Sequence, residues 1–161
     1  MSTVSLSISR DGVCSMIRLA QTNDELERCC RVLAQLRMAI SEPELLLRVK
    51  SQMRSGYRLA YIAVDDVVVS VAGFRFGENL AWGKFLYIDD LVSDENERSS
   101  GHGALLFQNL LKYAQKNICA TIHLDSGVQR FSAHKFYLRE GLKIASHHFS
   151  MRLESESFDV P

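Results

Sequence analysis

The sequence predicts an α/β (α+β) protein in which a mixed sheet carries helices on both faces. The chain has 161 residues, which is the length of one domain able to bury a core of its own. Hydrophobic residues make up 47% of it and charged residues 24%, an ordinary globular balance. The expected order of elements, β-α-α-β-β-β-α-β-α-β, mixes hairpins with crossover helices. We therefore expect a single domain over residues 1–161, with 1–14 as a loose leader and 154–161 as a loose tail.

The first half of the chain is expected to hold one short strand, two helices and a hairpin. Apolar residues at helical spacing follow N-cap candidates at 22–24, and Pro43 and Gly56 bracket a second helical stripe. Two runs rich in β-branched and aromatic residues flank a turn at 65–66. In order, these elements are a strand at 16–20, helices after 22–24 and after 41–43, and strands at 58–64 and 67–76.

The second half predicts two more helices and three more strands. A turn at 77–79 separates the hairpin from the next strand, and Gly101 opens a helix with an apolar face that includes Leu105 and Leu106. The elements expected here are strands at 85–92, 120–124 and 142–153, and helices from 101 onward and at 131–139.

Charge and composition exclude several classes of protein. Lys plus Arg and Asp plus Glu both number 19, so the chain lacks the basic excess of a nucleic-acid binder. No apolar run is long enough to cross a bilayer, and the N-terminus lacks the profile of a signal peptide. The four cysteines include no CxxC pair, and the adjacent Cys29 and Cys30 are expected to be buried thiols on a helix. We expect a cytoplasmic protein without a metal.

The most informative segment is 87–104, where a strand runs into a polar loop and then into a helix opened by Gly101 and Gly103. Such a turn gathers backbone N–H groups at the positive end of a helix dipole, which suits a phosphate. A simple strand-to-helix turn is the plain alternative. A P-loop is excluded because no lysine follows the glycines, and Leu106 spoils a dinucleotide fingerprint.

Two motifs stand in order along the chain: Arg98-x-x-Gly101-x-Gly103-Ala104, and a segment at 133–142 that includes Tyr137 and Gly141. The first is similar to the acyl-CoA signature of the GNAT superfamily of N-acyltransferases, and the second is similar to another conserved segment of that family. The resemblance covers about residues 16–153. It implies the GNAT fold, with a mixed, mostly antiparallel central sheet of six to seven strands flanked by helices on both faces.

The resemblance also implies which residues hold acetyl-CoA. The backbone at the end of the fourth strand would bind the pantetheine arm, and amides of the following loop would bind the pyrophosphate. Arg130 stands where the family often has Asn, and can reach a CoA phosphate or face solvent. The implied residues are Leu91, Val92, Ser93, Arg98, Ser99, Ser100, Gly101, His102, Gly103, Ala104 and Arg130.

Two side chains are candidates for proton transfer. Tyr137 matches the family's tyrosine that protonates the departing CoA thiolate, although an aromatic core position is the plain alternative. Asp89 is the expected base and resembles the acidic residue found on this strand in polyamine and glucosamine-phosphate acetyltransferases. Asp90 would point to the opposite face of a regular strand, and a bulge would exchange the faces.

The predicted function is N-acetyl transfer from acetyl-CoA to an amine by direct attack, with Tyr137 as general acid and Asp89 as base. One alternative is a non-catalytic, regulatory module that binds acyl-CoA, and another is a nucleotide-binding α/β protein of a different class. The acceptor is expected to be a small-molecule or peptide amine, with Trp82 as a candidate wall of its pocket. We expect a monomer or homodimer that binds neither nucleic acid nor membrane.

Overall fold

The computed structural model describes the backbone of residues 6–10 and 13–153 and the side chains of residues 18–153. The chain divides into two compact units, residues 1–124 and residues 125–161, which are described separately. The tail at 154–161 and the first five residues lie outside the described part of the chain.

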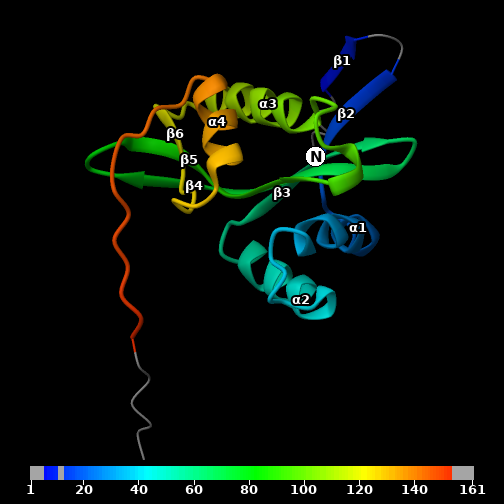
Figure 1. Ribbon diagram of the computed structural model, residues 1–161, viewed down its shortest axis with the longest axis horizontal. Coiled ribbons are helices and arrows are strands. Elements are labelled where there is room, and N and C mark those ends of the chain that lie inside the picture. The colour runs from blue at the N-terminus through cyan, green and yellow to red at the C-terminus, as the bar shows by residue number, and fades with distance from the viewer. Residues whose placement is uncertain (1–5, 11–12, 154–161) are drawn as a thin grey trace, which may run out of the picture. The chain divides into compact units, whose positions relative to one another are not determined.

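The first unit is built on a sheet whose strands follow one another in chain order (Figure 1). Neighbouring strands are antiparallel except for the last two, which are parallel. The strands are β1 (Leu6–Arg10), β2 (Val13–Leu19), β3 (Arg58–Val64), β4 (Val67–Asn79), β5 (Gly83–Ser93) and β6 (Thr121–Leu124). The mixed α/β architecture is confirmed.

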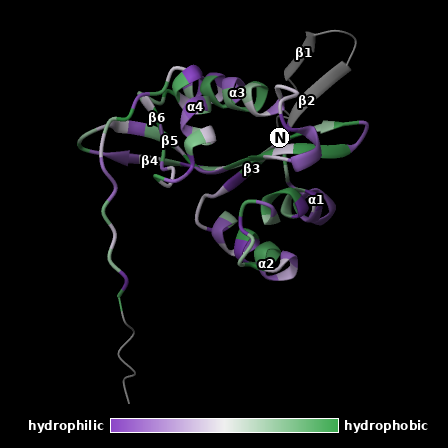
Figure 2. Ribbon diagram, in the orientation of Figure 1, coloured by the Kyte–Doolittle hydropathy of each residue, from purple (hydrophilic) through white to green (hydrophobic). Residues whose placement is uncertain are grey.

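Helices cover both faces of this sheet, as predicted. α1 (Asn23–Ala34) and α2 (Glu42–Met53) share one buried core with Leu59, Tyr61 and Val71 of β3 and β4. α3 (His102–Lys116) lies on the other face, where the Tyr113 ring meets Phe74 edge-on at 5.8 Å between centroids (Figure 1). All three helices carry both hydrophobic and hydrophilic residues, the pattern of a helix with one side in the core (Figure 2).

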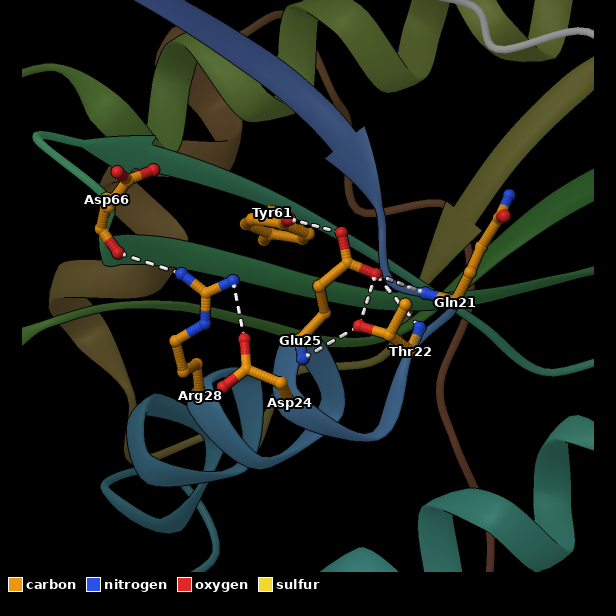
Figure 3. Close-up of polar contacts among 7 residues, drawn as sticks. All are labelled: Gln21, Thr22, Asp24, Glu25, Arg28, Tyr61 and Asp66. Carbon is orange, nitrogen blue, oxygen red and sulfur yellow. Dashed lines mark hydrogen bonds and ion pairs between the residues drawn. The ribbon is translucent and has the colours of Figure 1, made fainter.

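The N-terminus of α1 is tied to the sheet by one carboxylate (Figure 3). Thr22 and Glu25 form a capping box, and Glu25 also accepts a hydrogen bond from the Tyr61 hydroxyl of β3 at 2.9 Å. Partial burial raises the pKa of Glu25, but hydrogen bonds from Thr22 and Gln21 amides and from Tyr61 outweigh it and lower the pKa to about 2. Farther along α1, Cys29 and Cys30 are buried as predicted.

The sequence analysis ended one strand of the sheet too early and missed another. β4 runs on through Asn79, so the hairpin turn lies at 80–82 rather than at 77–79. Gly77 pairs with Phe85 inside the ladder and leaves room for that ring, because a Cβ there would lie 2.4 Å from the ring's Cζ. β1 was not predicted as a strand, and it pairs with β2 at the sheet edge.

The second unit contains α4 (Phe131–Arg139), which confirms the predicted helix. The strand predicted at 142–153 is wrong, because this segment is irregular and its apolar residues Ile144, Phe149 and Met151 are exposed. A strand requires a partner for its backbone, and the described residues of this unit form none. Of the six to seven strands predicted, five are found, as β2 to β6, and the remaining strand of the sheet is β1, which was not predicted.

Candidate active site

A β-bulge shapes the centre of β5. Gly73 of β4 pairs with Asp90 and the next residue, Phe74, pairs with Ile88, so Asp89 is the extra residue on β5. A bulge of this kind turns two successive side chains toward the same face of the sheet. β5 is therefore not the regular strand in which Asp90 would point away from Asp89; the bulge named as the alternative is present, and both carboxylates face the side covered by α1 and α2, where they line one cavity.

The side chains on either side of the bulge agree with this reading. Ile88 shares the α3 face with its partner Phe74, and Ser93 also faces α3, since a Cβ on Gly103 would lie 3.1 Å from the Ser93 hydroxyl. In a regular strand, residues five apart point to opposite faces. One inserted residue between Ile88 and Ser93 accounts for their common face.

Asp90 is fully engaged by its neighbours. One carboxylate oxygen accepts a hydrogen bond from the Tyr57 hydroxyl at 2.7 Å, and the other accepts one from Arg37 Nε at 2.8 Å and forms an ion pair with that guanidinium. Burial and the charge of Asp90 raise the pKa of Tyr57, so the hydroxyl keeps the proton that it donates. Tyr57 reaches Asp90 by crossing Gly73, where a Cβ would lie 1.8 Å from its hydroxyl oxygen.

Asp89 is held on one side only. Its Oδ2 accepts a hydrogen bond from Arg75 Nε at 2.9 Å, and the Arg75 guanidinium also donates to Gln52 of α2 at 2.7 Å. The hydrogen bond to Asp89 raises the pKa of Arg75. Oδ1 of Asp89 accepts no hydrogen bond from the described residues. Of the two carboxylates, Asp89 alone therefore keeps an oxygen available in the cavity.

The cavity has a volume of about 340 Å³. Buried aliphatic side chains of α1 and α2 line it together with charged and polar groups. It lies between the carboxylates of β5 and the segment that joins the two helices. The lining residues are Leu33, Arg37, Ile40, Leu45, Arg48, Val49, Gln52, Tyr57, Asp89 and Asp90.

Beyond the bulge, one edge of β5 has no strand beside it among the residues that the structure describes. The parallel pairing with β6 ends where Ile88 meets Leu124, whereas β5 continues to Ser93. The other edge stays paired with β4 as far as Ser93. Leu91, Val92 and Ser93, the predicted pantetheine-binding residues, thus lie on a segment whose β6-side edge meets no further strand of the first unit.

The loop after β5 leads to a helix start without a side-chain cap. Gly101 is the N-cap of α3 in a left-handed conformation (φ +85°), no side chain caps its amides, and its first turn carries no acidic residue. The first amides of a helix lack partners within the helix and carry partial positive charge. In α1 Thr22 and Glu25 satisfy these groups, whereas in α3 they remain available to an anion.

The other predicted loop residues sit around this start. Arg98 ends a short 3-10 turn at Glu95–Glu97, Ser99 is left-handed (φ +69°), and Ser100 follows it. His102 lies 3.6 Å from a Glu97 oxygen, and Ala104 is on the first turn. The loop is tied back to α1 by one side chain, because Gln35 donates to the Asp94 carboxylate at 2.8 Å and accepts from the Glu95 amide at 2.9 Å.

Tyr137 and Arg130 belong to the second unit. Arg130 is the N-cap of α4 and makes no side-chain capping bond there, and Tyr137 lies on the last turns of the helix. Burial raises the pKa of Tyr137, and the positive charge of Arg130 opposes this rise in part. The phenol therefore holds its proton at neutral pH, as a proton donor must.

Trp82, the candidate wall of an acceptor pocket, is not among the residues that line this cavity. It lies in the turn between β4 and β5, stacks on the His123 ring at 3.8 Å between centroids and meets Phe85 edge-on. Among the described residues no group of three or more His, Cys, Asp or Glu side chains is arranged to hold a metal ion. No helix in that part of the chain is both long and apolar enough to span a membrane.

Four residues of the site were missed by the sequence analysis: Arg37, Gln52, Tyr57 and Arg75. Each acts through a partner far away in the chain, and single-residue patterns do not encode such pairings. Gly73 offered one signal, because a glycine inside an apolar strand marks a bulge or a close approach. The Thr22-x-x-Glu25 pattern likewise identifies the capping box.

Residues 20–142 match the acetyltransferase (GNAT) family. The chain therefore belongs to the GNAT family, and it is an acetyltransferase.

One relative and several solved structures are similar to this chain. The chain is 27% identical over 138 residues to the uncharacterized N-acetyltransferase YhdJ of Bacillus subtilis (strain 168), a match that covers 83% of this chain and 97% of that protein. Its fold is similar to that of the aminoglycoside N-acetyltransferase AAC(6')-Iy in complex with CoA (TM-score 0.78, 12% identity, 91% and 99% of the two chains). It is also similar to a transcriptional regulator from Bacillus halodurans C-125 (TM-score 0.75, 22% identity, 86% and 99%).

Proposed function

We propose that this protein transfers an acetyl group from acetyl-CoA to an amine acceptor by direct attack, as one domain over residues 1–161. The observation that carries the proposal is the continuous path along β5. A bulge presents Asp89 to a cavity, an unpaired strand edge follows, and the strand leads to the uncapped start of α3. The cavity would hold the acceptor, the strand edge would bind the arm that carries the thioester, and the helix start would bind the pyrophosphate, so the three features follow one another in the order that the reaction needs.

Coenzyme A would lie along the second half of this path. The pantetheine amides would pair with the backbone of Leu91, Val92 and Ser93 as an added strand does. The pyrophosphate would accept hydrogen bonds from amides between Arg98 and Ala104, at the positive end of the α3 dipole. The structurally similar AAC(6')-Iy was solved with CoA, which supports this choice of cofactor.

The acceptor amine would enter the cavity beside Asp89. Its nitrogen attacks the thioester carbonyl carbon, a C–N bond forms, and the C–S bond breaks as the tetrahedral intermediate collapses. The proton lost by the amine passes to Oδ1 of Asp89, the carboxylate oxygen that other described residues leave available. The departing CoA thiolate takes a proton from Tyr137, whose raised pKa keeps the phenol protonated until that step.

Asp90 has a different role in this proposal. Both of its oxygens are engaged by Tyr57 and Arg37, so it fixes the bulge and the segment after α1 rather than accepting a proton. The fixed bulge in turn determines where Asp89 points. Positioning of this kind contributes much of the rate in a direct transfer between two bound substrates.

A thermal-shift screen with acetyl-CoA, CoA, ATP and NAD tests the cofactor before the acceptor is known. We expect stabilisation by acetyl-CoA and CoA, and a free-thiol release assay over a panel of amines then tests turnover. Protection by ATP or NAD instead of CoA would favour the nucleotide-binding alternative. Protection by CoA without thiol release from any amine would favour a regulatory module that only binds acyl-CoA.

A further inference from the structure

The hydrogen-bonding groups that remain available in the cavity are mostly donors. Arg37 uses Nε and Nη2 for Asp90 and the Asp89 carbonyl, so its Nη1 has no partner in the described part of the chain. Gln52 accepts from Arg75 through Oε1, which leaves its amide NH₂ without a partner there. Against these donors stands one available carboxylate oxygen, Oδ1 of Asp89.

Arg48 adds a third donor group to the same wall. It lies one turn before Gln52 on α2, so the two side chains share a face of that helix, and both line the cavity. Among the described residues Arg48 pairs with Glu44 alone, and both side chains are half exposed (56% and 50%). Exposed pairs of this kind contribute little stability, so an incoming anion can replace Glu44 at low cost.

We propose that the acceptor carries an anionic group, a carboxylate or a phosphate, in addition to its amine. The inference rests on the proposed function and deepens it by naming the substrate class. The amine would meet Asp89 on the sheet side of the cavity. The anion would meet Arg48, with Arg37 Nη1 and the Gln52 amide beside it, on the helix side.

The dimensions and chemistry of the cavity support this division. A volume of about 340 Å³ is at the small end for a ligand site and suits an acceptor of amino-acid size. Guanidinium groups recognise carboxylates and phosphates in preference to neutral groups, because their hydrogen bonds are then charge-assisted. A neutral monoamine would leave these donors facing the cavity without a partner.

Matched acceptors in the thiol-release assay test the proposal. One set is an α-amino acid, its amide and the corresponding decarboxylated amine, and the second is ethanolamine phosphate with ethanolamine. Each kcat/KM is calculated from the concentration of the unprotonated amine, so that differences in amine pKa between acceptors do not mimic selectivity. We expect kcat/KM of the anionic member to exceed that of its neutral partners by about ten- to a hundredfold, the value of one charge-assisted hydrogen bond. The two sets distinguish a carboxylate from a phosphate.

Substitutions on α2 and at its C-terminal end test which side chain binds the anionic group. Arg48→Gln should bring the ratio of anionic to neutral kcat/KM close to one, mainly by raising KM for the anionic acceptor, and Arg48→Glu should reverse the preference. Arg54→Gln should leave the ratio unchanged, because Arg54 is the exposed residue that follows α2 and its side chain donates a hydrogen bond to Ser51. Both positions are exposed, so these variants are expected to fold.

The outcomes separate this inference from the proposed function. If neutral amines are acetylated as well as or better than anionic ones, or if CoA binds but no anionic acceptor releases thiol, the substrate class is wrong and acetyl-CoA binding still stands. If acetyl-CoA neither stabilises the protein nor releases thiol with any acceptor, the proposed function itself fails. An Arg48→Gln variant that keeps full selectivity would overturn the assigned location of the anion.

Discussion

Gly73→Ala tests how the bulge is held, because the new Cβ would occupy space that the Tyr57 side chain fills. An ideal Cβ at this position lies 1.8 Å from the Tyr57 hydroxyl oxygen, 2.4 Å from Cζ and 2.7 Å from Cε2. The hydroxyl would have to retreat by about 1.6 Å to reach the shortest ordinary contact of 3.4 Å. A displacement of that size breaks its 2.7 Å hydrogen bond to Asp90.

Gly73→Ala is expected to destabilise the fold in two ways, by breaking a hydrogen bond and by overpacking the core. A hydrogen bond to a charged acceptor contributes about 1.5–3 kcal/mol. Overpacking in a rigid core costs about 1–3 kcal/mol, and Tyr57 is only 3% exposed. We therefore expect the free energy of unfolding to fall by about 3–5 kcal/mol, which corresponds to a Tm lower by about 6–20 °C for a chain of this length.

Urea unfolding of a double-mutant cycle measures the effect. Removing the ring with Tyr57→Ala should make the additional Gly73→Ala change nearly free, whereas Tyr57→Phe should not, because Cζ remains in the way. Gly56→Ala is the matched control, since its Cβ would meet no atom within 4 Å. Its left-handed backbone (φ +92°) alone should lower the free energy of unfolding, by about 1–2 kcal/mol. A Gly73→Ala cost no larger than that of this control, or a cost that is the same with and without the Tyr57 ring, would show that the close approach of Tyr57 to Gly73 is not what makes the substitution unfavourable.

Three further predictions concern other parts of the protein. Gly103→Val should weaken CoA binding by at least about tenfold in calorimetry, because its side chain would press on Ser93 and obstruct the helix start; unchanged affinity in a folded variant would contradict the proposed phosphate site. The folded-state pKa of Glu25 is about 2, below its ordinary value of 4.5, so its contribution to stability is full above pH 4.5 and lost as the pH falls toward 2. The urea midpoint of Glu25→Gln should vary less with pH in that window than that of the unsubstituted protein, and equal slopes would show that the capping carboxylate does not matter. Tyr137→Phe should retain acetyl-CoA affinity and lower kcat by about a hundredfold or more; an unaffected kcat would mean that water or another group protonates the thiolate.

The elements whose sequence signals are local could be predicted. The apolar stripes of α1, α2 and α3, the helix start at Gly101 and the turn at Asp65 and Asp66 all depend on residues within a few positions of one another. Both turn residues adopt the left-handed backbone typical of a tight hairpin. These signals, together with two motifs, were sufficient for the fold class and the family.

The features that failed depend on residues far apart in the chain. The segment 142–153 has the composition of a strand, but a strand forms only where a neighbour accepts its hydrogen bonds. The direction of Asp90 depends on one inserted residue opposite β4, and a one-residue shift exchanges the faces of a strand. The bulge is held by Tyr57 and Arg37, which lie 33 and 53 positions away from Asp90, so only the folded chain reveals it.

The central claim is that Asp89 exchanges the proton while Asp90 holds the structure, and the pH dependence of two isosteric variants tests it most directly. With acetyl-CoA saturating and the best acceptor of the panel, kcat is measured against pH for Asp89→Asn and Asp90→Asn, and the Tm of each is recorded. We expect Asp89→Asn to lower kcat by about a hundredfold or more, most strongly at low pH where few acceptor amines are already neutral, with little change in Tm. Asp90→Asn should lower the Tm, because it weakens the contacts with Arg37 and Tyr57, and should retain the shape of the pH profile. A larger, pH-dependent loss of kcat in Asp90→Asn, with Asp89→Asn nearly as active as the unsubstituted enzyme, would contradict the assignment.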